Sequence, residues 1–359
     1  MEFIHKLKEK KNKKDLKKIL QNTPATEYSG EYVLDVENLS VRFDTDDATV
    51  YAVNNVDLKL KKKKTLGLVG ETGAGKTTTV LSLLKLIPSP PGVITSGTIR
   101  VNGKDVMEMS KHELQFMRGK EVAMIFQDPM TSLNPVMTVG DQIAEGILLH
   151  ENISKADAFK KAQEMLRTVG IEEVRAYDYP YQFSGGMKQR VVIAIALACN
   201  PNILIADEPT TALDVTIQAQ VLDLMKKLKE TNDMSMIMIT HDLGIVAETC
   251  DDVAIMYAGR IVESGTLEEV FNHTKHPYTE GLFNSLPNMN DRNSQLTPIK
   301  GLTPDPTIQY TGCPFAERCE YATEACTAQP PAIHKFSDTH MVACTAYEDP
   351  DFHIKRGEK

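Results

Sequence analysis

The sequence predicts an α/β fold with a mostly parallel central sheet, and three observations support this prediction. Short apolar runs typical of buried strands alternate with longer helical patterns. A glycine-rich segment lies between the apolar run 65–69 and the helical pattern 78–87. Polar residues also follow directly on other apolar runs, and the carboxyl ends of parallel strands are where open α/β sheets bind ligands.

The glycine-rich segment, residues 70–77, has the spacing G-x-x-x-x-G-K-[ST] of a phosphate-binding loop. Its glycines let successive backbone N–H groups turn toward anionic oxygens, and the N-terminus of the following helix adds partial positive charge. We expect Lys76 to reach the β- and γ-phosphates of a nucleotide and the Thr77 hydroxyl to ligate Mg²⁺. A glycine turn before a helix, with a chance Lys-Thr, is the alternative. The predicted nucleotide contacts in this segment are Gly70, Thr72, Gly73, Ala74, Gly75, Lys76, Thr77 and Thr78.

Length and composition limit the classes of protein to consider. A chain of 359 residues is longer than the usual ceiling for one core, about 250–300 residues, so we expect a large domain with an accessory part. The net charge of -9 argues against general nucleic-acid binding. We expect no signal peptide, because the first twenty residues are rich in lysine, and no membrane span, because no apolar run is long enough.

The segments before the glycine-rich loop are a basic tail and a β-rich region. Residues 1–20 predict either a basic helix on an anionic membrane surface or a solvated tail, followed by a linker to residue 30. Alternating runs then predict strands. Phe43 lies far enough upstream of the loop to fold back onto a purine, or it is a core residue. The predicted strands are 33–36, 40–43, 50–56 and 58–60.

The middle of the chain predicts an inserted helical subdomain. A hairpin is expected near residues 97–103 and a short helix at 111–119. The apolar strand 122–126 ends at Gln127, and residues 130–139 are loop-like. Helical patterns follow at 140–150, 155–169 and 188–199, the last opened by Ser184, Gly185 and Gly186, a second anion site or a simple N-cap.

Three more polar sites follow apolar strands or their loops. The run 202–206 ends in Asp207 and Glu208, one of which could serve Mg²⁺ and the other an attacking water. Asp214 lies in the next loop, and His241 ends the strand 235–240. The runs 253–257 and 260–263 predict a hairpin.

Together, these motifs and their order resemble the ATP-binding cassette (ABC) family over about residues 32–270. Residues 70–77 match the Walker A loop, 184–187 the signature motif, and 203–208 the Walker B strand with its glutamate. Gln127 matches the Q-loop, residues 212–214 the D-loop, His241 the switch histidine, and Phe43 the adenine-stacking position. The resemblance implies a RecA-like P-loop NTPase core with an antiparallel β subdomain and the helical subdomain, here about 128–188.

The resemblance also implies a mechanism. ATP would bind with Mg²⁺, held by Thr77, Gln127 and Asp207, while Glu208 accepts the proton of the attacking water. His241 would hold the γ-phosphate and that water. Two cassettes would close head to tail, each presenting Ser184, Gly185 and Gly186 to the nucleotide on the other. Met187 replaces the usual glutamine of the signature motif, which leaves the backbone contacts intact.

A finer similarity is to the ATPase subunits of dipeptide and oligopeptide importers, carried by residues 127–135, 183–190, 276–279 and 312–344. It implies two membrane permease subunits, a second related ATPase or a homodimer, and indirectly an extracytoplasmic peptide-binding protein. The chain would act at the cytoplasmic face of the membrane, docking through residues 128–140. Nickel importers belong to the same subgroup. The sequence also leaves open a soluble cassette ATPase of DNA repair or translation and a non-hydrolysing regulatory subunit.

Four cysteines in the C-terminal extension, residues 271–359, form a separate candidate site. Thiolates in a short, loop-like segment can hold a metal ion or a [4Fe–4S] cluster. The spacing lacks paired C-x-x-C knuckles and resembles the iron–sulfur extension of peptide-importer ATPases, with zinc or unligated thiols as alternatives. We expect Cys199 and Cys250 to be buried small hydrophobes instead. The candidate ligands are Cys313, Cys319, Cys326 and Cys344.

Overall fold

The computed structural model describes residues 30–211, 213–285 and 298–355. The chain forms two compact units. Of the described residues, the first unit contains 30–33, Lys61–Lys63, 102–211 and 213–237. The second contains Leu34–Leu60, Lys64–Val101, 238–285 and 298–355. The basic segment 1–20, predicted as a membrane-surface helix or a solvated tail, lies outside the described residues.

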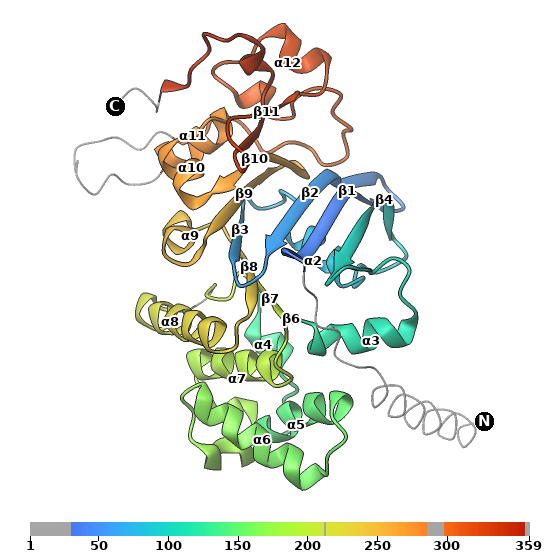
Figure 1. The fold of residues 1–359 in the computed structure, drawn as a ribbon, viewed down its shortest axis with the longest axis vertical. Coiled ribbons are helices and arrows are strands. Elements are labelled where there is room, and N and C mark those ends of the chain that lie inside the picture. Colours follow the sequence, from blue (N-terminus) through green and yellow to red (C-terminus); the bar gives the residue numbers. More distant parts are fainter. Residues whose placement is uncertain (1–29, 212, 286–297, 356–359) are drawn as a thin grey trace. The chain divides into compact units, whose positions relative to one another are not determined.

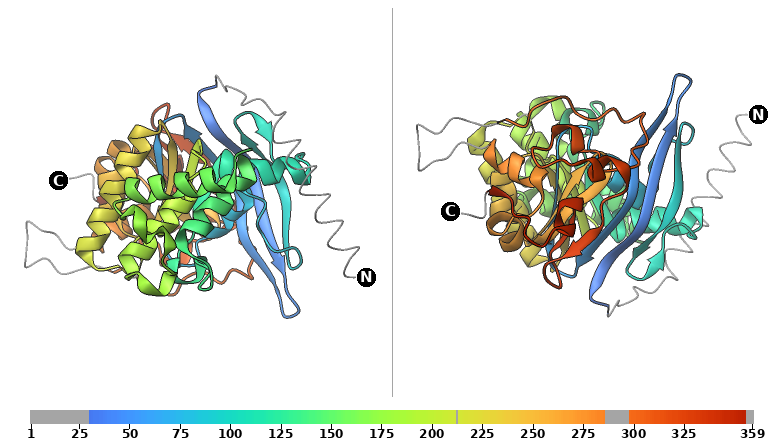
Figure 2. Two further views of the ribbon diagram at one scale, coloured as in Figure 1. Left: turned by 90° about the horizontal axis from the view of Figure 1, so that it is seen from below. Right: turned by 90° about the horizontal axis from the view of Figure 1, so that it is seen from above.

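Long strands form an antiparallel sheet in the second unit, coloured blue to teal in Figures 1 and 2. In this sheet β1 (Tyr32–Asp44) lies between β2 (Thr49–Lys61) and β4 (Gly92–Val101). β1 and β4 pair antiparallel, and Phe43 is opposite Gly92. Where the sequence predicted two strands on either side of residue 38, the structure has one, because a register shift and the positive φ of Asn38 absorb the break in alternation.

A second sheet of the same unit carries the glycine-rich loop. Its strand order is β11-β12-β10-β9-β3, in which β3 and β9 are parallel. The predicted hairpin is confirmed: β9 and β10 pair antiparallel across a turn in which Ala258 and Gly259 have positive φ. The strands of this sheet are β3 (Thr65–Val69), β9 (Asp252–Tyr257), β10 (Arg260–Thr266), β11 (Ile333–Lys335) and β12 (Met341–Ala343). The helices of this unit are α2 (Lys76–Leu83), α9 (Leu243–Thr249), α10 (Leu267–Asn272), α11 (Pro277–Asn284), α12 (Glu324–Ala328), η3 (Ala316–Arg318) and η4 (Thr345–Glu348).

The C-terminal segment is more ordered than the loop-like pattern predicted. β12 pairs with β10, placing Val342 opposite Glu263, and β11 pairs with β12. Figure 1 shows this segment in orange to red, with β11 near β10 and the short helix α12 above them. Strands of three residues are too short to show an alternating pattern in the sequence. They form here because β10 offers an edge with which β12 can pair.

The first unit combines a parallel strand pair with a helical layer. β6 and β7 are parallel, with Ile125 opposite Ala206, and β7 is buried along its whole length. The predicted helices are confirmed, and α5, α6 and α7 lie together in Figure 1. β8 (Ser235–Thr240) crosses the unit boundary in the sequence. The elements of this unit are β5 (Lys104–Asp105), α3 (Lys111–Lys120), β6 (Val122–Ile125), α4 (Pro129–Ser132), α5 (Val139–His150), α6 (Lys155–Thr168), η1 (Glu173–Tyr177), η2 (Pro180–Gln182), α7 (Gly185–Leu197), β7 (Ile203–Asp207) and α8 (Val215–Thr231).

Side-chain caps explain where several of these helices begin. The hydroxyls of Thr138 and Ser154 each accept a hydrogen bond from the backbone N–H three residues later, at the N-termini of α5 and α6. One boundary differs from the expectation: residues 130–139 were predicted as a loop, but α4 occupies the first part of this segment. Proline at the first helical position favours such a turn of helix.

Candidate functional site

The phosphate loop joins the buried strand β3 to helix α2 in the second unit. Gly73 and Gly75 have φ values of 83° and 99°, in the left-handed region that favours glycine. A Cβ atom at Gly70 would lie 2.2 Å from the Met256 carbonyl oxygen, and one at Gly75 would lie 2.3 Å from the Ala52 carbonyl oxygen. The glycines of the motif are therefore required both by backbone conformation and by close packing.

Lys76 begins helix α2 and holds the loop together. Its side chain is buried, and its Nζ donates hydrogen bonds to the carbonyl oxygens of Gly70 at 2.7 Å and Glu71 at 3.0 Å. Thr72, Gly73 and Thr77 are exposed, whereas Ala74 is buried and Thr78 is half-buried. The loop thus offers a buried ammonium group beside exposed backbone and hydroxyl groups, which is the chemistry that binds phosphates.

Phe43 lies near the end of β1 and is half-buried. Its Cε1 atom is 3.0 Å from where a Cβ of Gly92 would lie, so the ring packs against the start of β4. Stacking of this ring on adenine stays a prediction.

Two predicted residues meet at the strand ends of the first unit. Gln127 follows β6, Glu208 follows β7, and the Gln127 amide Nε2 donates to the Glu208 carboxylate at 2.9 Å. The Thr211 hydroxyl donates to the same carboxylate oxygen at 3.0 Å. Asp207, the last residue of β7, is buried, whereas Gln127 is exposed. The carboxyl edge of this strand pair therefore carries an acid held by neutral hydrogen-bond donors.

The backbone at Glu208 is constrained. Its φ of 45° is left-handed, a conformation that is uncommon outside glycine and that is found at functional sites. The following residue is held by a side chain that the sequence analysis did not single out: the buried amide of Gln189 in α7 donates to the Pro209 carbonyl oxygen at 2.6 Å. The sequence signal for this contact is a single glutamine just before a run of apolar residues in the predicted helix.

The Ser-Gly-Gly segment opens helix α7, as predicted. Ser184 is the N-cap, and its exposed side chain makes no capping hydrogen bond within the described chain. A Cβ at Gly185 would have no described atom within 4 Å, whereas one at Gly186 would lie 2.5 Å from Ile217 Cγ2. The N-terminal N–H groups of α7 thus lie at an uncovered part of the first unit.

Asp214 and His241 also lie where the sequence predicts. Asp214 is the N-cap of α8 and accepts a hydrogen bond from the Ile217 N–H at 3.0 Å. His241 is exposed and follows directly on β8. Ala212, between Glu208 and Asp214, lies outside the described residues.

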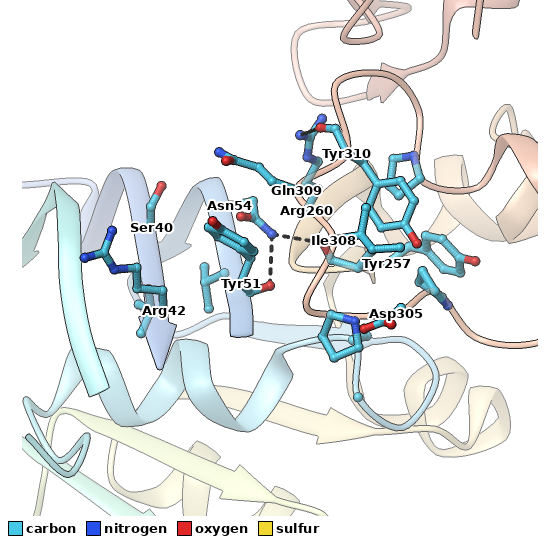
Figure 3. A pocket seen from close by; sticks show the side chains of 18 of the residues that line it. Ser40, Arg42, Tyr51, Asn54, Tyr257, Arg260, Asp305, Ile308, Gln309 and Tyr310 are labelled. Carbon is cyan, nitrogen blue, oxygen red and sulfur yellow. Dashed lines mark hydrogen bonds between the residues drawn. The ribbon is translucent and has the colours of Figure 1, made fainter. Parts of the chain in front are cut away.

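A pocket of about 390 Å³ lies in the second unit (Figure 3). The loop residues 71–74 form part of its wall, and residues 303–306 and 308–310 of the C-terminal extension form another part. Figure 3 shows Ser40 and Arg42 on one strand, Tyr51 and Asn54 on the next, and Asp305, Ile308 and Tyr310 on the facing segment. Phe43 and Lys76 do not line this pocket. The C-terminal extension therefore lies next to the phosphate loop, which the sequence analysis did not predict.

The four cysteines of the extension line one small cavity, together with Phe315 and Tyr321. Burial, with a smaller contribution from the neighbouring cysteines, raises the pKa of the Cys344 thiol to about 11 and that of Cys319 to about 12. Burial likewise raises the pKa of Cys313. Cys199 and Cys250 lie elsewhere and are buried, as expected for small hydrophobes.

The metal site expected from these cysteines is not formed as a recognisable cluster. Within residues 30–211, 213–285 and 298–355, no group of three or more His, Cys, Asp or Glu side chains is arranged to hold a metal ion. Sharing a cavity is a weaker arrangement than ligation, because thiolate ligands of one metal must converge within about 2.3 Å of it.

The same described ranges contain no helix that is both long enough and apolar enough to span a bilayer.

Comparisons with known proteins cover most of the chain. The ABC transporter family matches residues 53–211, and the C-terminal region of oligopeptide/dipeptide transporters matches residues 262–326. The chain is 52% identical over 313 residues to the oligopeptide transport ATP-binding protein OppD of Bacillus subtilis strain 168, covering 86% of this chain and 87% of that protein. It is 49% identical over 316 residues to the dipeptide transport ATP-binding protein DppD of the same organism, covering 88% and 94%.

A solved structure is similar as well. A dimeric ATP-binding cassette in a post-hydrolysis state, bound to ADP and Pi, has a TM-score of 0.59 and 27% sequence identity to the chain, covering 65% of this chain and 98% of that one. The phosphate loop, the strand-end glutamate and the Ser-Gly-Gly helix start agree with these similarities, and the chain belongs to the family of ABC transporter ATP-binding proteins.

Proposed function

We propose that the chain is the ATP-hydrolysing subunit of a transporter that imports di- and oligopeptides. The similarity to OppD and DppD extends over more than four fifths of the chain, including the C-terminal region named for oligopeptide and dipeptide transporters. The observation that carries the enzymatic part is the Glu208 carboxylate at the end of buried β7, hydrogen-bonded by Gln127 and Thr211. Such a base, delivered to a sheet edge in a chain that also has a phosphate loop, suits hydrolysis of a nucleotide.

The phosphate loop would hold ATP. Lys76 and the loop N–H groups would bind the β- and γ-phosphates, and Phe43 would stack on adenine. Thr77, being exposed at the start of α2, has its hydroxyl available for Mg²⁺.

Mg²⁺ prefers hard oxygen ligands and is usually bound through few protein groups together with phosphate oxygens and water. The donor types of Thr77, Asp207 and Gln127 fit that preference. The ion would neutralise charge on the phosphates. Glu208 would then accept the proton of the attacking water, and His241 would hold that water and the γ-phosphate.

A second cassette completes the proposal. Ser184, Gly185 and Gly186 would contact the γ-phosphate bound by a partner cassette, either a related ATPase or a second copy, and Asp214 would lie at the same interface. Closure would drive two separate permease subunits, with residues 128–140 as the docking segment and a peptide-binding protein acting on the other side. The chain would then work at the cytoplasmic face of the membrane. The proposed domain boundaries are near residues 30 and 270, with the helical subdomain at about 128–188.

The test is uptake of labelled di- and oligopeptides, with Ni²⁺ in parallel, in cells whose only copy carries Glu208→Gln. We expect peptide uptake to be lost and Ni²⁺ uptake to be unchanged. Loss of Ni²⁺ uptake alone would replace the cargo and keep the mechanism, and no loss of either would reject the importer. A Glu230→Gln variant, which removes an exposed carboxylate elsewhere in the first unit, is the control. A DNA pull-down with Glu208→Gln separates the importer from a soluble ATPase of DNA repair.

We also propose that the cysteine cavity holds a [4Fe–4S] cluster, with one zinc ion as the alternative. The supporting observation is that all four thiols line the same cavity although residues 313 and 344 are far apart in sequence. Four cysteines are the common ligand set of such a cluster. Cys313, Cys319, Cys326 and Cys344 would hold it, and it would fasten the extension.

Iron and sulfide analysis of the anaerobically purified chain tests this second proposal. We expect about four iron and four sulfide per chain. One equivalent of zinc without iron would reject the cluster. If neither iron nor zinc is found, the thiols are unligated and the cluster is rejected as well. The matched control is a Cys199→Ser variant, which should keep the full iron content because Cys199 lies outside the cavity.

A further inference from the structure

The second residue of the phosphate loop is bound by the C-terminal extension. Arg318 Nη1 donates to Glu71 Oε2 at 2.8 Å, and Arg318 Nη2 donates to Glu71 Oε1 at 3.1 Å. The Arg318 side chain is only 7% exposed and that of Glu71 is 26% exposed. A two-pronged pair of this kind is strong and fixes direction as well as distance.

Arg318 is itself held in one position. Its Nε donates to the Lys300 carbonyl oxygen at 3.0 Å, and Nη1 donates to the Tyr257 hydroxyl at 3.2 Å. The guanidinium carbon lies 5.8 Å from the centre of the Tyr257 ring, within reach of a cation–π contact. Because every arm of the guanidinium has a partner, Glu71 is bound to a rigid group.

The backbone of Glu71 has a second anchor. Its N–H donates to the hydroxyl of Tyr278 at 3.0 Å, and Tyr278, in α11, is fully buried. The ring centre of Tyr278 lies 4.6 Å from that of Tyr257 and 5.4 Å from that of Phe315. A packed aromatic cluster thus stands behind the phosphate loop.

These contacts reach the cation of the loop through one residue. The Glu71 carbonyl oxygen accepts hydrogen bonds from Lys76 Nζ at 3.0 Å and from the Ala74 N–H at 3.1 Å. A shift of Glu71 would therefore move both the ammonium group and the turn of the loop. The neighbouring pocket also shows that the extension lies next to the loop, because residues 71–74 and residues of the extension both line it.

We propose that Arg318 is a positioning residue for the phosphate loop, which acts through Glu71 to keep Lys76 and the loop N–H groups in the geometry that binds the phosphates of ATP. The inference rests on the proposed function, since it takes ATP as the ligand of the loop. Arg318 lies between Cys313 and Cys319 and ends η3, so the fold of the cysteine segment sets the affinity of the loop for nucleotide. An extension that served stability alone would have no such effect.

The experiment compares three variants of the full chain: Glu71→Gln, Arg318→Met and the double variant. Arg318→Met keeps most of the aliphatic stem, so packing changes little. The measurements are the Kd for Mg·ATP and for ADP by calorimetry, the KM and kcat of hydrolysis, and the thermal midpoint. We expect each single variant to raise both Kd values about tenfold, as for loss of a hydrogen bond to a charged group.

The double variant separates positioning from stability. It leaves no buried charge without a partner, so its thermal midpoint should return toward that of the wild type. Its Kd should nevertheless stay about tenfold raised rather than about a hundredfold, because both residues act through one contact. Wild-type Kd in the double variant, or Kd values within twofold in all three, would overturn the proposal. If a single variant does not fold, the Kd of the double variant is sufficient to test the proposal.

Two further variants complete the design. Arg318→Lys keeps the charge but not the two-pronged geometry, and should recover part of the affinity. Arg100→Met removes an exposed ion pair in the antiparallel sheet of the same unit, in which Arg100 Nη1 lies 3.1 Å from Glu37 Oε2. This control variant should leave Kd within twofold of the wild-type value. If the wild-type chain binds no nucleotide, it is the proposed function that fails rather than this inference.

Discussion

The phosphate loop and the Ser-Gly-Gly segment are both glycine-rich helix starts, yet their surroundings differ. In the phosphate loop, added Cβ atoms at Gly70 and Gly75 would come within 2.3 Å of carbonyl oxygens, and Lys76 is buried. At the start of α7, no described atom would lie within 4 Å of a Cβ at Gly185, and Ser184 is exposed. The phosphate loop is packed against its own chain at Gly70 and Gly75, whereas the Ser-Gly-Gly segment is open at Ser184 and Gly185 and packed only at Gly186.

The difference shows how two similar local patterns can serve different tasks. A loop that must hold several phosphate oxygens at once benefits from being arranged before the ligand arrives, because less ordering is left for binding. A segment that acts on a nucleotide carried by a partner must stay uncovered until that partner is present. The following changes test this contrast and the residues that act with it, from the largest expected effect to the smallest.

Glu208→Gln should have the largest effect. The variant keeps the size of the side chain but removes the base, so ATP hydrolysis should fall about 10²- to 10⁴-fold. ATP affinity should stay within about twofold, because the phosphate loop is untouched. Steady-state hydrolysis and nucleotide calorimetry check this, with Glu230→Gln as the control. Hydrolysis at the wild-type rate would remove Glu208 from the chemistry.

Gly75→Ala tests the enclosed site directly. The new Cβ would meet the Ala52 carbonyl oxygen and would sit at a φ of 99°, so we expect the free energy of unfolding to fall by about 3 kcal/mol. The matched control is Gly185→Ala, where the free energy should change by less than about 0.5 kcal/mol. Urea denaturation measures both. Equal losses in the two variants would contradict the contrast.

Ser184→Ala tests the open site. If the Ser184 hydroxyl contacts a phosphate as proposed, its loss should lower hydrolysis about tenfold in the assembled ATPase. The thermal midpoint should not change, because the exposed Ser184 side chain makes no capping bond with the described chain. A drop in the midpoint that accounts for the lost activity would make Ser184 a structural cap.

Glu269→Gln should have the smallest effect, which is a loss in the free energy of unfolding that depends on pH. Burial alone would raise the pKa of Glu269, but hydrogen bonds from Ser337, Thr266 and Thr339 outweigh it and lower the pKa to about 2. The lowered pKa stabilises the fold above the unfolded value of 4.5, and this stabilisation is lost as the pH falls from 4.5 toward 2. The variant should therefore cost about 1–2 kcal/mol at pH 7 and less at about pH 3.

Urea denaturation at both pH values measures this change. Glu268→Gln is the control, because its exposed neighbouring carboxylate should show no comparable loss. A cost for Glu269→Gln that stays constant with pH would argue that the hydrogen bonds, and not the charge, stabilise the site.

The sequence by itself determined the local elements of the site. Glycines at fixed spacing before Lys76 specify a phosphate loop, because the backbone conformation that the loop needs is local. The apolar runs before Gln127, Glu208 and His241 specify strand ends, because a buried strand appears in the sequence as consecutive apolar residues. The helix starts of the first unit followed in the same way from capping residues.

Only the tertiary structure decided which distant residues meet. Glu71 and Arg318 are 247 positions apart, and neither stands out in its own segment. The pairing of β12 with β10 and the contact of Gln189 with Pro209 are equally non-local. Such contacts depend on how whole elements pack, and a short window of sequence carries the propensity of an element but not the identity of its neighbour.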